Sequence, residues 1–212
     1  MRRPIPTPVM HFTHVDHLPS IIRRGLLADA TAHASRVVTV EVGHKEIKQR
    51  RSARVVPVAP GGVVADYAPF YFAARSPMLY VIAKGGVPTY SGSCDDLIYL
   101  ATTVERLLEL TLRPVFTDRN AAKGYAAFTS EPAELDDLVD WALMKARMWT
   151  DTEDEPDRKE RRMAECLVHR RVPWEAFDEI VTRTPACARR VQRALATVGP
   201  SVQVVVRRGW YF

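Results

Sequence analysis

A single carboxylate stands in the middle of an apolar stretch, residues 163–168. In a β-strand, successive side chains point to opposite faces, and the residues of this stretch would bury both faces. Burying an unpaired polar group costs on the order of 2–7 kcal/mol, and burying a charge costs more. Glu165 therefore has either a partner, such as Arg161 or Arg170 at a strand edge, or a role in chemistry. The spacing alone leaves both explanations open.

Alternating polar residues mark a second place where chemistry is possible. The segment Val9–Thr13 has the pattern of a first strand, and His11 and Thr13 fall on the same face of it. A lone histidine on such a face is most often a core residue with a hydrogen-bond partner. The threonine two positions along adds a second polar group, so a small polar platform for a ligand is the alternative.

A basic run over residues 43–54 could supply positive charge. As a helix, it would place His44, Lys48 and Arg51 on one face, because residues three and four apart are neighbours. Such runs are commonly solvated surfaces. They can also clamp phosphate, since guanidinium and ammonium groups pair with the oxygens of a pyrophosphate or a DNA backbone.

The rest of the chain supplies the elements that hold these groups. Strands outnumber helices and do not alternate regularly with them, which is typical of an α+β fold. Residues 150–162 carry many charges and no apolar period, so a loop or a frayed turn is expected there. Strands are expected at 9–13, 96–100, 115–117, around 180–181 and at 202–206; extended segments at 63–82, broken by a turn at 75–77; and helices after Asp16, at 104–110, at 118–128, across 135–146 and at 186–195.

Composition restricts the class of protein. The chain has 212 residues, of which 47% are hydrophobic and 26% charged, as in ordinary globular proteins. A net charge of +5 favours anionic partners such as nucleic acid. Three widely spaced cysteines, Cys94, Cys166 and Cys187, argue against a disulfide framework or a zinc site and favour the reducing cytoplasm. No apolar run approaches the ~18 residues of a membrane span, and no signal peptide is expected.

Six short segments, each weak alone, occur in an order that is highly specific. They are His11–His14, Ile47–Arg51, Asp66–Phe72, Arg75–Tyr80, Phe116–Ala121 and Arg162–Glu165. Together they resemble the DarT family, the DNA ADP-ribosyltransferase toxins of DarT–DarG toxin–antitoxin systems, from about Pro4 to Phe212. Two departures, Ser93-Cys94 in place of a Gly-Gln-like turn and Cys166 in place of Phe, fall outside the expected catalytic positions.

The resemblance implies a fold and a reaction. The fold would be a single ADP-ribosyltransferase-like domain over residues 1–212, with a central mixed or antiparallel split sheet and flanking helices. Residues 31–54 would form an NAD-binding element and residues 119–165 the substrate-recognition region. The enzyme would transfer ADP-ribose from NAD, without a metal, to a base of single-stranded DNA, most often thymine N3, and so block replication. It would be a cytoplasmic monomer, not bound to a membrane, with the macrodomain antitoxin DarG as its partner.

The resemblance also assigns residues. Glu165 matches the family's catalytic glutamate, which stabilises the oxocarbenium-like transition state as the N-glycosidic bond of NAD breaks. Arg51 matches a catalytic arginine near the NAD phosphates and the incoming base. A guanidinium with a pKa above ~12 is a poor base, so stabilising a thymine anion is the easier role, with Lys48 as the second candidate. The cofactor-binding positions would be His11, Phe12, Thr13, Ser20, Ala28, Lys48, Tyr71, Arg75 and Met78, and the DNA-binding positions Arg119, Arg147 and Trp149.

Two other functions are compatible with the sequence. An ADP-ribosyltransferase that acts on protein or RNA would have the same scaffold and the same Glu165, and only its substrate loop would differ. A non-catalytic NAD-binding or nucleic-acid-binding module is the other alternative. The intact set of Glu165, His11, Thr13 and Arg51 argues against the module, because binding alone does not require a buried carboxylate.

Overall fold

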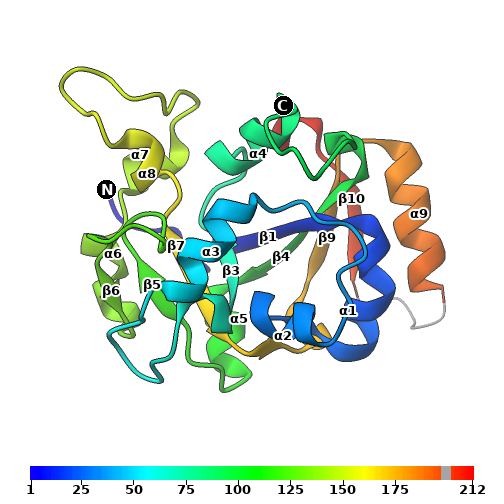
Figure 1. Cartoon of the computed structure of the whole chain (residues 1–212), viewed down its shortest axis with the longest axis horizontal. Coiled ribbons are helices and arrows are strands. Elements are labelled where there is room, and N and C mark those ends of the chain that lie inside the picture. Colours follow the sequence, from blue (N-terminus) through cyan, green and yellow to red (C-terminus); the bar gives the residue numbers. More distant parts are fainter. Residues whose placement is uncertain (197–201) are drawn as a thin grey trace.

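A mixed sheet of eight strands runs through the computed structural model, which describes residues 1–196 and 202–212 (Figure 1). The strand order is β10-β9-β4-β1-β3-β7-β5-β6, and neighbours pair antiparallel except β9 with β10, which are parallel. A small second sheet joins β2 to β8. The α+β class expected from the sequence is confirmed.

The bounds of the elements are as follows. The strands are β1 (Pro8–His14), β2 (Leu26–Leu27), β3 (Tyr67–Tyr71), β4 (Leu97–Thr103), β5 (Val115–Thr117), β6 (Phe128–Thr129), β7 (Glu165–His169), β8 (Arg171–Val172), β9 (Glu179–Thr182) and β10 (Gln203–Val206). The helices are α1 (Leu18–Arg24), α2 (Asp29–Ala34), α3 (Lys45–Ala53), α4 (Pro77–Ala83), α5 (Val104–Glu109), α6 (Leu135–Leu138), α7 (Trp141–Lys145), α8 (Arg158–Arg161) and α9 (Pro185–Leu195).

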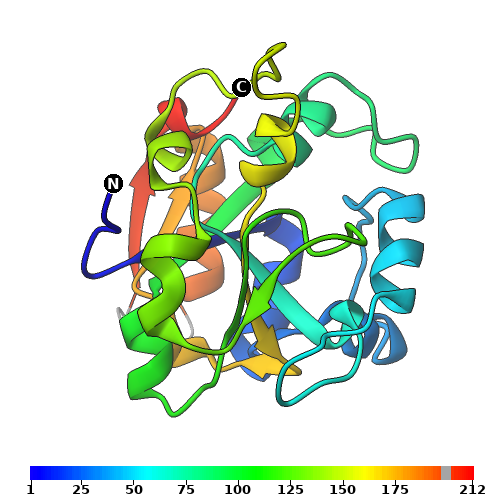
Figure 2. The ribbon, with the colours of Figure 1, turned by 90° about the vertical axis from the view of Figure 1, so that its left-hand side faces the viewer.

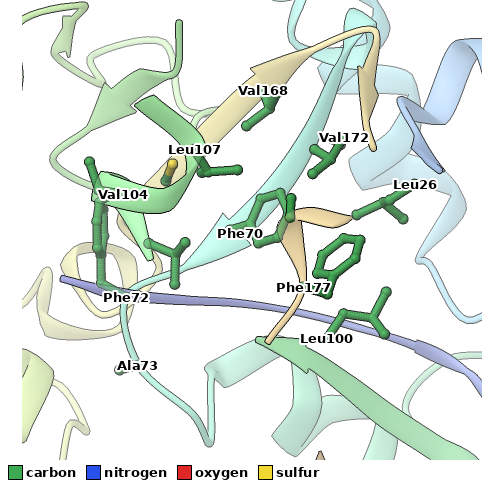
Figure 3. Packing of buried hydrophobic residues seen from close by; sticks show 14 of the residues in the cluster. Leu26, Phe70, Phe72, Ala73, Leu100, Val104, Leu107, Val168, Val172 and Phe177 are labelled. Atoms are coloured by element: carbon green, nitrogen blue, oxygen red, sulfur yellow. The ribbon is translucent and has the colours of Figure 1, made fainter. Parts of the chain in front are cut away.

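The sheet is buried on both faces, which explains why its central strands read as continuous apolar runs. In β4, Ile98 and Leu100 join one core cluster, whereas Leu97 and Tyr99 join another on the opposite face. Figure 3 shows the first cluster around Phe70, with side chains from β4, β7, α5 and the segment before β9 packed about it. A strand with two buried faces cannot slip in register without moving apolar side chains, so the sheet is held rigidly.

The sheet divides between β1 and β3. The strand β1 pairs with β4 along its whole length, and β3 pairs with β7 along its whole length. Between β1 and β3 there is a single register pair, Met10 opposite Tyr71. Beyond that pair the two strands separate, which confirms the split sheet that the resemblance implied. The helices α2 and α3 lie together on one side of this division (Figure 2).

One expected extended segment is helical. Residues 77–83 form α4, although their aromatic and β-branched side chains favour a strand. Ser76 is the N-cap and accepts a hydrogen bond from the backbone N–H of Leu79 at 3.2 Å, and Pro77 occupies the first turn. A Ser-Pro pair is a strong helix start, and here it outweighs the composition of the residues that follow.

Two other expectations about the middle of the chain are wrong. Residues 118–127 form a loop between β5 and β6, because Asp118 caps a turn by accepting from the backbone N–H of Ala127 at 2.9 Å instead of starting a helix. The pattern over 135–146 forms two short helices, since Val139 is extended and Asp140 caps α7. The charged run 150–162 agrees with the loop or frayed turn expected from its charges: it is irregular up to the single helical turn α8, where Arg161 forms ion pairs with Asp140, Glu155 and Asp157.

Candidate active site

A cavity of about 320 Å³ lies where the sheet divides. Its lining comes from β1 and the turn after it, from β2, β3, α1, α2, α3 and α4, from the irregular segment 37–43, and from single residues in the loops before β6 and β7. These elements are far apart in the sequence, so the cavity exists only because the fold brings them together.

Glu165 is the first residue of β7 and its side chain is fully buried. The strand β7 lies inside the sheet between β3 and β5, so a strand-edge carboxylate paired with Arg161 or Arg170 is excluded. The carboxylate instead accepts hydrogen bonds from Arg51 Nη1 at 2.8 and 3.1 Å and from the backbone N–H of Ala121 at 2.9 Å. The buried negative charge of Glu165 is therefore compensated by the guanidinium of Arg51 on α3 and by a backbone N–H of the 118–127 loop.

Arg51 lies in the last turn of α3 and lines the cavity, whereas Glu165 behind it does not. The helical face expected from the spacing is confirmed, because His44, Lys48 and Arg51 all line the cavity. Burial alone would lower the pKa of Arg51, but the adjacent Glu165 carboxylate outweighs burial and raises this pKa, so the guanidinium stays charged. Its Nη2 atom is buried without a hydrogen-bond partner in the described part of the chain. A ligand that reached this donor would not have to displace an existing hydrogen bond.

His11 and Thr13 both line the cavity from β1. The Nδ1 atom of His11 lies 2.7 Å from the carbonyl oxygen of Pro69 on β3, across the division of the sheet. A carbonyl only accepts, so Nδ1 carries the proton and Nε2 is left as an acceptor. Burial lowers the pKa of His11 to about 4, so the ring is neutral at neutral pH.

Four more of the expected NAD-binding residues, Phe12, Ser20, Tyr71 and Met78, line the same cavity. Tyr71 lies directly opposite Glu165 in the ladder between β3 and β7. Burial raises the pKa of its phenol, which therefore stays protonated and can donate a hydrogen bond.

Two expected NAD-binding residues lie elsewhere. Ala28 is fully buried and does not line the cavity. Arg75 does not line it either, and its guanidinium lies 4.5 Å from the ring centre of Phe212. In this conformation both can act on a ligand only through the residues that they pack against.

Lys48 reaches the cavity, but its charge is already compensated. Its Nζ donates to Asp29 at 2.8 Å and to Glu41 at 2.7 Å, and lies 2.7 Å from His33 Nε2. A phosphate would have to displace these carboxylates before it could pair with the lysine. Lys48 instead ties α3 to α2 and to the segment 37–43.

Trp149, expected to stack on an extruded base, is 8% exposed. Its ring packs against those of Tyr80 and Phe212, with centroids 6.0 and 6.3 Å away. The indole thus packs the aromatic cluster beside α4 and has no free face in this conformation.

The two expected DNA-binding arginines differ. Arg119 is held by Asp118 at 2.8 Å and Asp157 at 3.1 Å, whereas Arg147 is exposed. Close to Arg119, sequence reasoning missed Tyr125, which is 63% exposed. The Arg119 guanidinium lies 5.2 Å from the centre of this ring, and the phenol donates to Glu160. Figure 2 shows the 118–127 loop reaching towards α3, and Ala126 accepts a long hydrogen bond from Arg54 at its end.

Sequence reasoning also missed groups that hold the carboxylate in place. Thr117 Oγ1 accepts from the backbone N–H of Glu165 at 3.0 Å, and the backbone of Ala121 holds the side chain. Arg162, 5% exposed, donates to the carbonyls of Leu143, Met144, Ala146 and Ala74. Backbone donors leave no signal in side-chain types, although the segment Phe116–Ala121 belongs to the resemblance stated above.

Within residues 1–196 and 202–212, no group of three or more histidine, cysteine, aspartate or glutamate side chains is placed to hold a metal ion. Over the same residues, every helix is too short or too polar to cross a membrane.

Comparisons with known proteins agree with this geometry. A sequence model described as "ssDNA thymidine ADP-ribosyltransferase, DarT" matches residues 10–212. A DNA ADP-ribosyl transferase of Mycobacterium tuberculosis is 37% identical over 215 residues, covering 100% of this chain and 91% of that protein. One from Thermus sp. (strain 2.9) is 34% identical over 211 residues, covering 99% and 98%.

Solved structures give the same result. Thermus sp. 2.9 DarT in complex with ADP-ribosylated ssDNA superposes with a TM-score of 0.92 at 33% identity, covering 100% of this chain and 99% of that one. The same protein in complex with NAD+ gives a TM-score of 0.88 at 32% identity, with 99% and 100% covered.

Proposed function

This chain belongs to the DarT family of ssDNA thymidine ADP-ribosyltransferases, and we propose from that membership how its own residues transfer ADP-ribose from NAD to thymine in single-stranded DNA. It is an NAD-dependent DNA ADP-ribosyltransferase, and modification of template bases gives it the role of a toxin. The observation that carries the assignment of residues is the buried carboxylate of Glu165, compensated by Arg51 at the wall of the cavity.

The cavity is the NAD site in this proposal. His11 and Thr13 hold the nicotinamide ribose end from β1, and Tyr71 and Met78 line the cavity from β3 and α4. Nicotinamide leaves with the electron pair of the glycosidic bond, and the ribose carbon becomes cationic. Glu165 stabilises that cation once the Arg51 guanidinium shifts from the carboxylate towards the incoming base. Thymine N3 then bonds to the ribose carbon and loses its proton to solvent.

Arg51 acts as an electrostatic stabiliser in this reaction. Burial alone would lower its pKa, but the carboxylate of Glu165 raises this pKa, which supports a role other than proton acceptor. Its Nη2, which has no partner among the described residues, can donate to a thymine carbonyl oxygen as negative charge develops on the ring. This supports the anion-stabilising role over that of a base.

The substrate is single-stranded because the reacting atom is hidden in a duplex. Thymine N3 pairs with adenine, so a duplex would first have to open at a cost of a few kcal/mol. We place the DNA against the 119–165 region, whose 118–127 loop carries the exposed Tyr125 and also holds Glu165 through Ala121. Residues 31–54 supply the NAD wall, and both regions belong to one domain over residues 1–212.

DarG is the proposed antitoxin partner. A protein of Thermosipho africanus described as a "DNA ADP-ribosyl transferase-DNA ADP-ribosyl glycohydrolase fusion protein" is 26% identical over 87% of this chain, which spans 45% of that protein. A reversing enzyme joined to such a transferase supports a partner of that activity here. We further propose that the enzyme is a monomer that acts in the cytoplasm, where its DNA substrate lies. Light scattering after gel filtration tests the oligomeric state.

One experiment tests the function directly. The protein is incubated with NAD and a single-stranded oligonucleotide, and nucleosides from the digested DNA are analysed by mass spectrometry. Thymidine carrying one ADP-ribose is expected. Matched strands without thymine, a duplex, and a protein extract serve as comparisons, and preferred labelling of the extract or of thymine-free DNA would contradict the proposal. An RNA strand is tested in parallel, and labelling of the RNA alone would favour the alternative of an ADP-ribosyltransferase that acts on RNA.

A further inference from the structure

His17, which the reaction described above does not use, lies between the strand β1 and the wall of the cavity. It follows β1 in a short 3-10 turn, Val15–His17, and its side chain lines the cavity. Its Nδ1 atom lies 2.9 Å from Thr13 Oγ1. Its Nε2 atom lies 3.2 Å from the backbone nitrogens of Thr39 and of Val40. One imidazole therefore joins a cavity residue on the sheet to the segment opposite.

The hydrogen bonds fix which nitrogen of His17 carries the proton. Both neighbours of Nε2 are backbone N–H groups, which only donate, so Nε2 must be the acceptor. Nδ1 then carries the proton and donates it to Thr13 Oγ1. Thr13 Oγ1 accepts from the ring in this way, and its own O–H has no acceptor among the described residues, so this proton is free to be donated to a ligand in the cavity.

The segment 37–43 depends on this contact. It has no helix or strand, and it contributes six of its seven residues to the cavity wall. Among the described residues, His17 is the one side chain of β1 or its following turn that hydrogen-bonds to the segment. On its other side the segment is tied to α2 and α3: the backbone N–H of Val37 donates to the carbonyl of Ala32 at 3.1 Å, and Glu41 pairs with Lys48 at 2.7 Å. Protonating His17 would place an N–H against two N–H groups and remove the wall's anchor to the sheet.

We propose that His17 is a positioning residue for NAD: its neutral ring directs the Thr13 hydroxyl into the cavity and anchors the segment 37–43, and protonation of the ring releases both. This inference rests on the proposed NAD site. The charged and titratable groups that face the ring are His11, His14 and Asp16 from β1 and its turn, Glu41 from the wall, and Lys48 from α3.

The direction of the pH effect follows from these surroundings. Burial is the largest influence and lowers the pKa of His17 below 6.5, with His14 and Lys48 acting in the same direction and Asp16 and Glu41 opposing. The ring is thus neutral at neutral pH. NAD affinity should weaken as the pH falls below the pKa of His17, by up to about 10-fold per pH unit for one linked proton.

Two amide variants separate the functions of the ring. In His17→Gln, the side-chain oxygen reaches the position of Nε2 and can accept from the wall. In His17→Asn, the amide nitrogen reaches the position of Nδ1 and can donate to Thr13. Neither variant titrates. His17→Phe removes both contacts, and His14→Asn is the matched control at a neighbouring histidine that does not line the cavity.

The measurement is the dissociation constant of NAD between pH 7.5 and 5 by calorimetry, with thermal unfolding to confirm the fold of each variant. The wild type and His14→Asn should lose affinity progressively as the pH falls below the pKa of His17, with the largest loss at pH 5. Both amide variants should bind about 3- to 10-fold more weakly at pH 7.5 and lose little more on acidification. An unchanged acid loss in both amide variants would overturn the proposal, as would wild-type affinity in a folded His17→Phe. Absence of NAD binding by the wild type at pH 7.5 would instead contradict the proposed function.

Discussion

At the scale of single residues, the pair Arg51–Glu165 shows how stability and chemistry share one contact. Both side chains are buried, and each compensates the charge of the other at 2.8 Å. Removing one partner of a buried ion pair typically costs about 3–5 kcal/mol, because the other charge is left unpaired. Substitutions at this pair therefore change both the activity and the folding stability of the protein. A measurement of activity has to be accompanied by a measurement of stability.

The first prediction concerns the carboxylate. Glu165→Gln keeps the shape and can still accept from the backbone of Ala121, but it loses the charge that faces the cationic ribose. DNA modification should fall at least ~10²-fold, as on loss of one electrostatic donor. The melting temperature should also drop, since Arg51 is left unpaired. Quantitative mass spectrometry of labelled oligonucleotide, with calorimetric melting, checks both. Transfer of ADP-ribose by Glu165→Gln at the wild-type rate would show that the carboxylate is not catalytic.

The second prediction concerns stability and pH. Burial lowers the pKa of His11 to about 4, and it also lowers those of His14 and His17 below 6.5. In the unfolded chain these rings take up protons near pH 6.5, before the folded chain does, so stability falls as the pH drops from about 6.5 towards 4. The urea midpoint at pH 5 should be lower than at pH 7.5. The difference should be smaller in His11→Gln; equal differences would show that His11 is not the group that titrates.

At the scale of elements, the 118–127 loop joins the buried carboxylate of Glu165 to the surface that we propose meets DNA. It follows β5 and holds Glu165 through the backbone of Ala121. Four residues later it exposes the ring of Tyr125, whose hydroxyl and one face are held by Glu160 and Arg119. The other face of this ring is free to stack on a base. Because the ring is already held in place, stacking would cost little further side-chain entropy.

The third prediction compares two aromatic residues. Tyr125→Ala should weaken binding of a thymine-containing oligonucleotide by about 10-fold, since base stacking on an aromatic ring contributes ~1–3 kcal/mol. Tyr125→Phe keeps the ring and should bind nearly as the wild type. Trp149→Ala should lower the melting temperature more than Tyr125→Ala does, because the indole is buried against Tyr80 and Phe212.

Fluorescence anisotropy of a labelled strand, together with NAD calorimetry, checks this comparison. Unchanged DNA affinity in Tyr125→Ala, with a loss in Trp149→Ala at equal stability, would restore Trp149 as the residue that contacts the base.

The sequence predicts the elements with strong periodicity and misses those set by single side chains. The strands β1, β4, β5 and β9 and the helix α9 follow from apolar patterns. The helix α4 does not, because Ser76 and Pro77 decide it against the propensity of the residues after them. Glu165 could be singled out because a charge in an apolar strand is costly. Its partner Arg51, 114 positions away, required the resemblance, since no local pattern encodes a long-range pair.

At the scale of the whole molecule, the net charge of +5 acts on DNA more than on NAD. Much of the positive charge near the reacting centre is internally paired, as at Lys48 and Arg161, so attraction of a strand relies on exposed residues such as Arg147. This part of the affinity is nonspecific and sensitive to salt.

The fourth prediction follows from that charge. Oligonucleotide affinity should fall about 10-fold between 50 and 200 mM salt, as for a protein that contacts a few phosphates of a single strand. The affinity for NAD should change much less, because the cationic side chains Lys48 and Arg51 that line its proposed site are already paired with carboxylates. Anisotropy titrations over a salt series check the first and calorimetry the second. A flat salt series would mean that base contacts alone hold the strand.

The single register pair between β1 and β3 also bears on how the enzyme could be inhibited. His11 and Thr13 belong to the half of the sheet that contains β4, whereas Glu165 belongs to the half that contains β7. A small compound that fills only the β1 side would compete with NAD and leave the Arg51–Glu165 pair intact. A larger compound that spans both halves would have to displace the guanidinium from the carboxylate. Substitutions of Arg51 should therefore weaken binding of the larger compound and leave binding of the smaller one nearly unchanged.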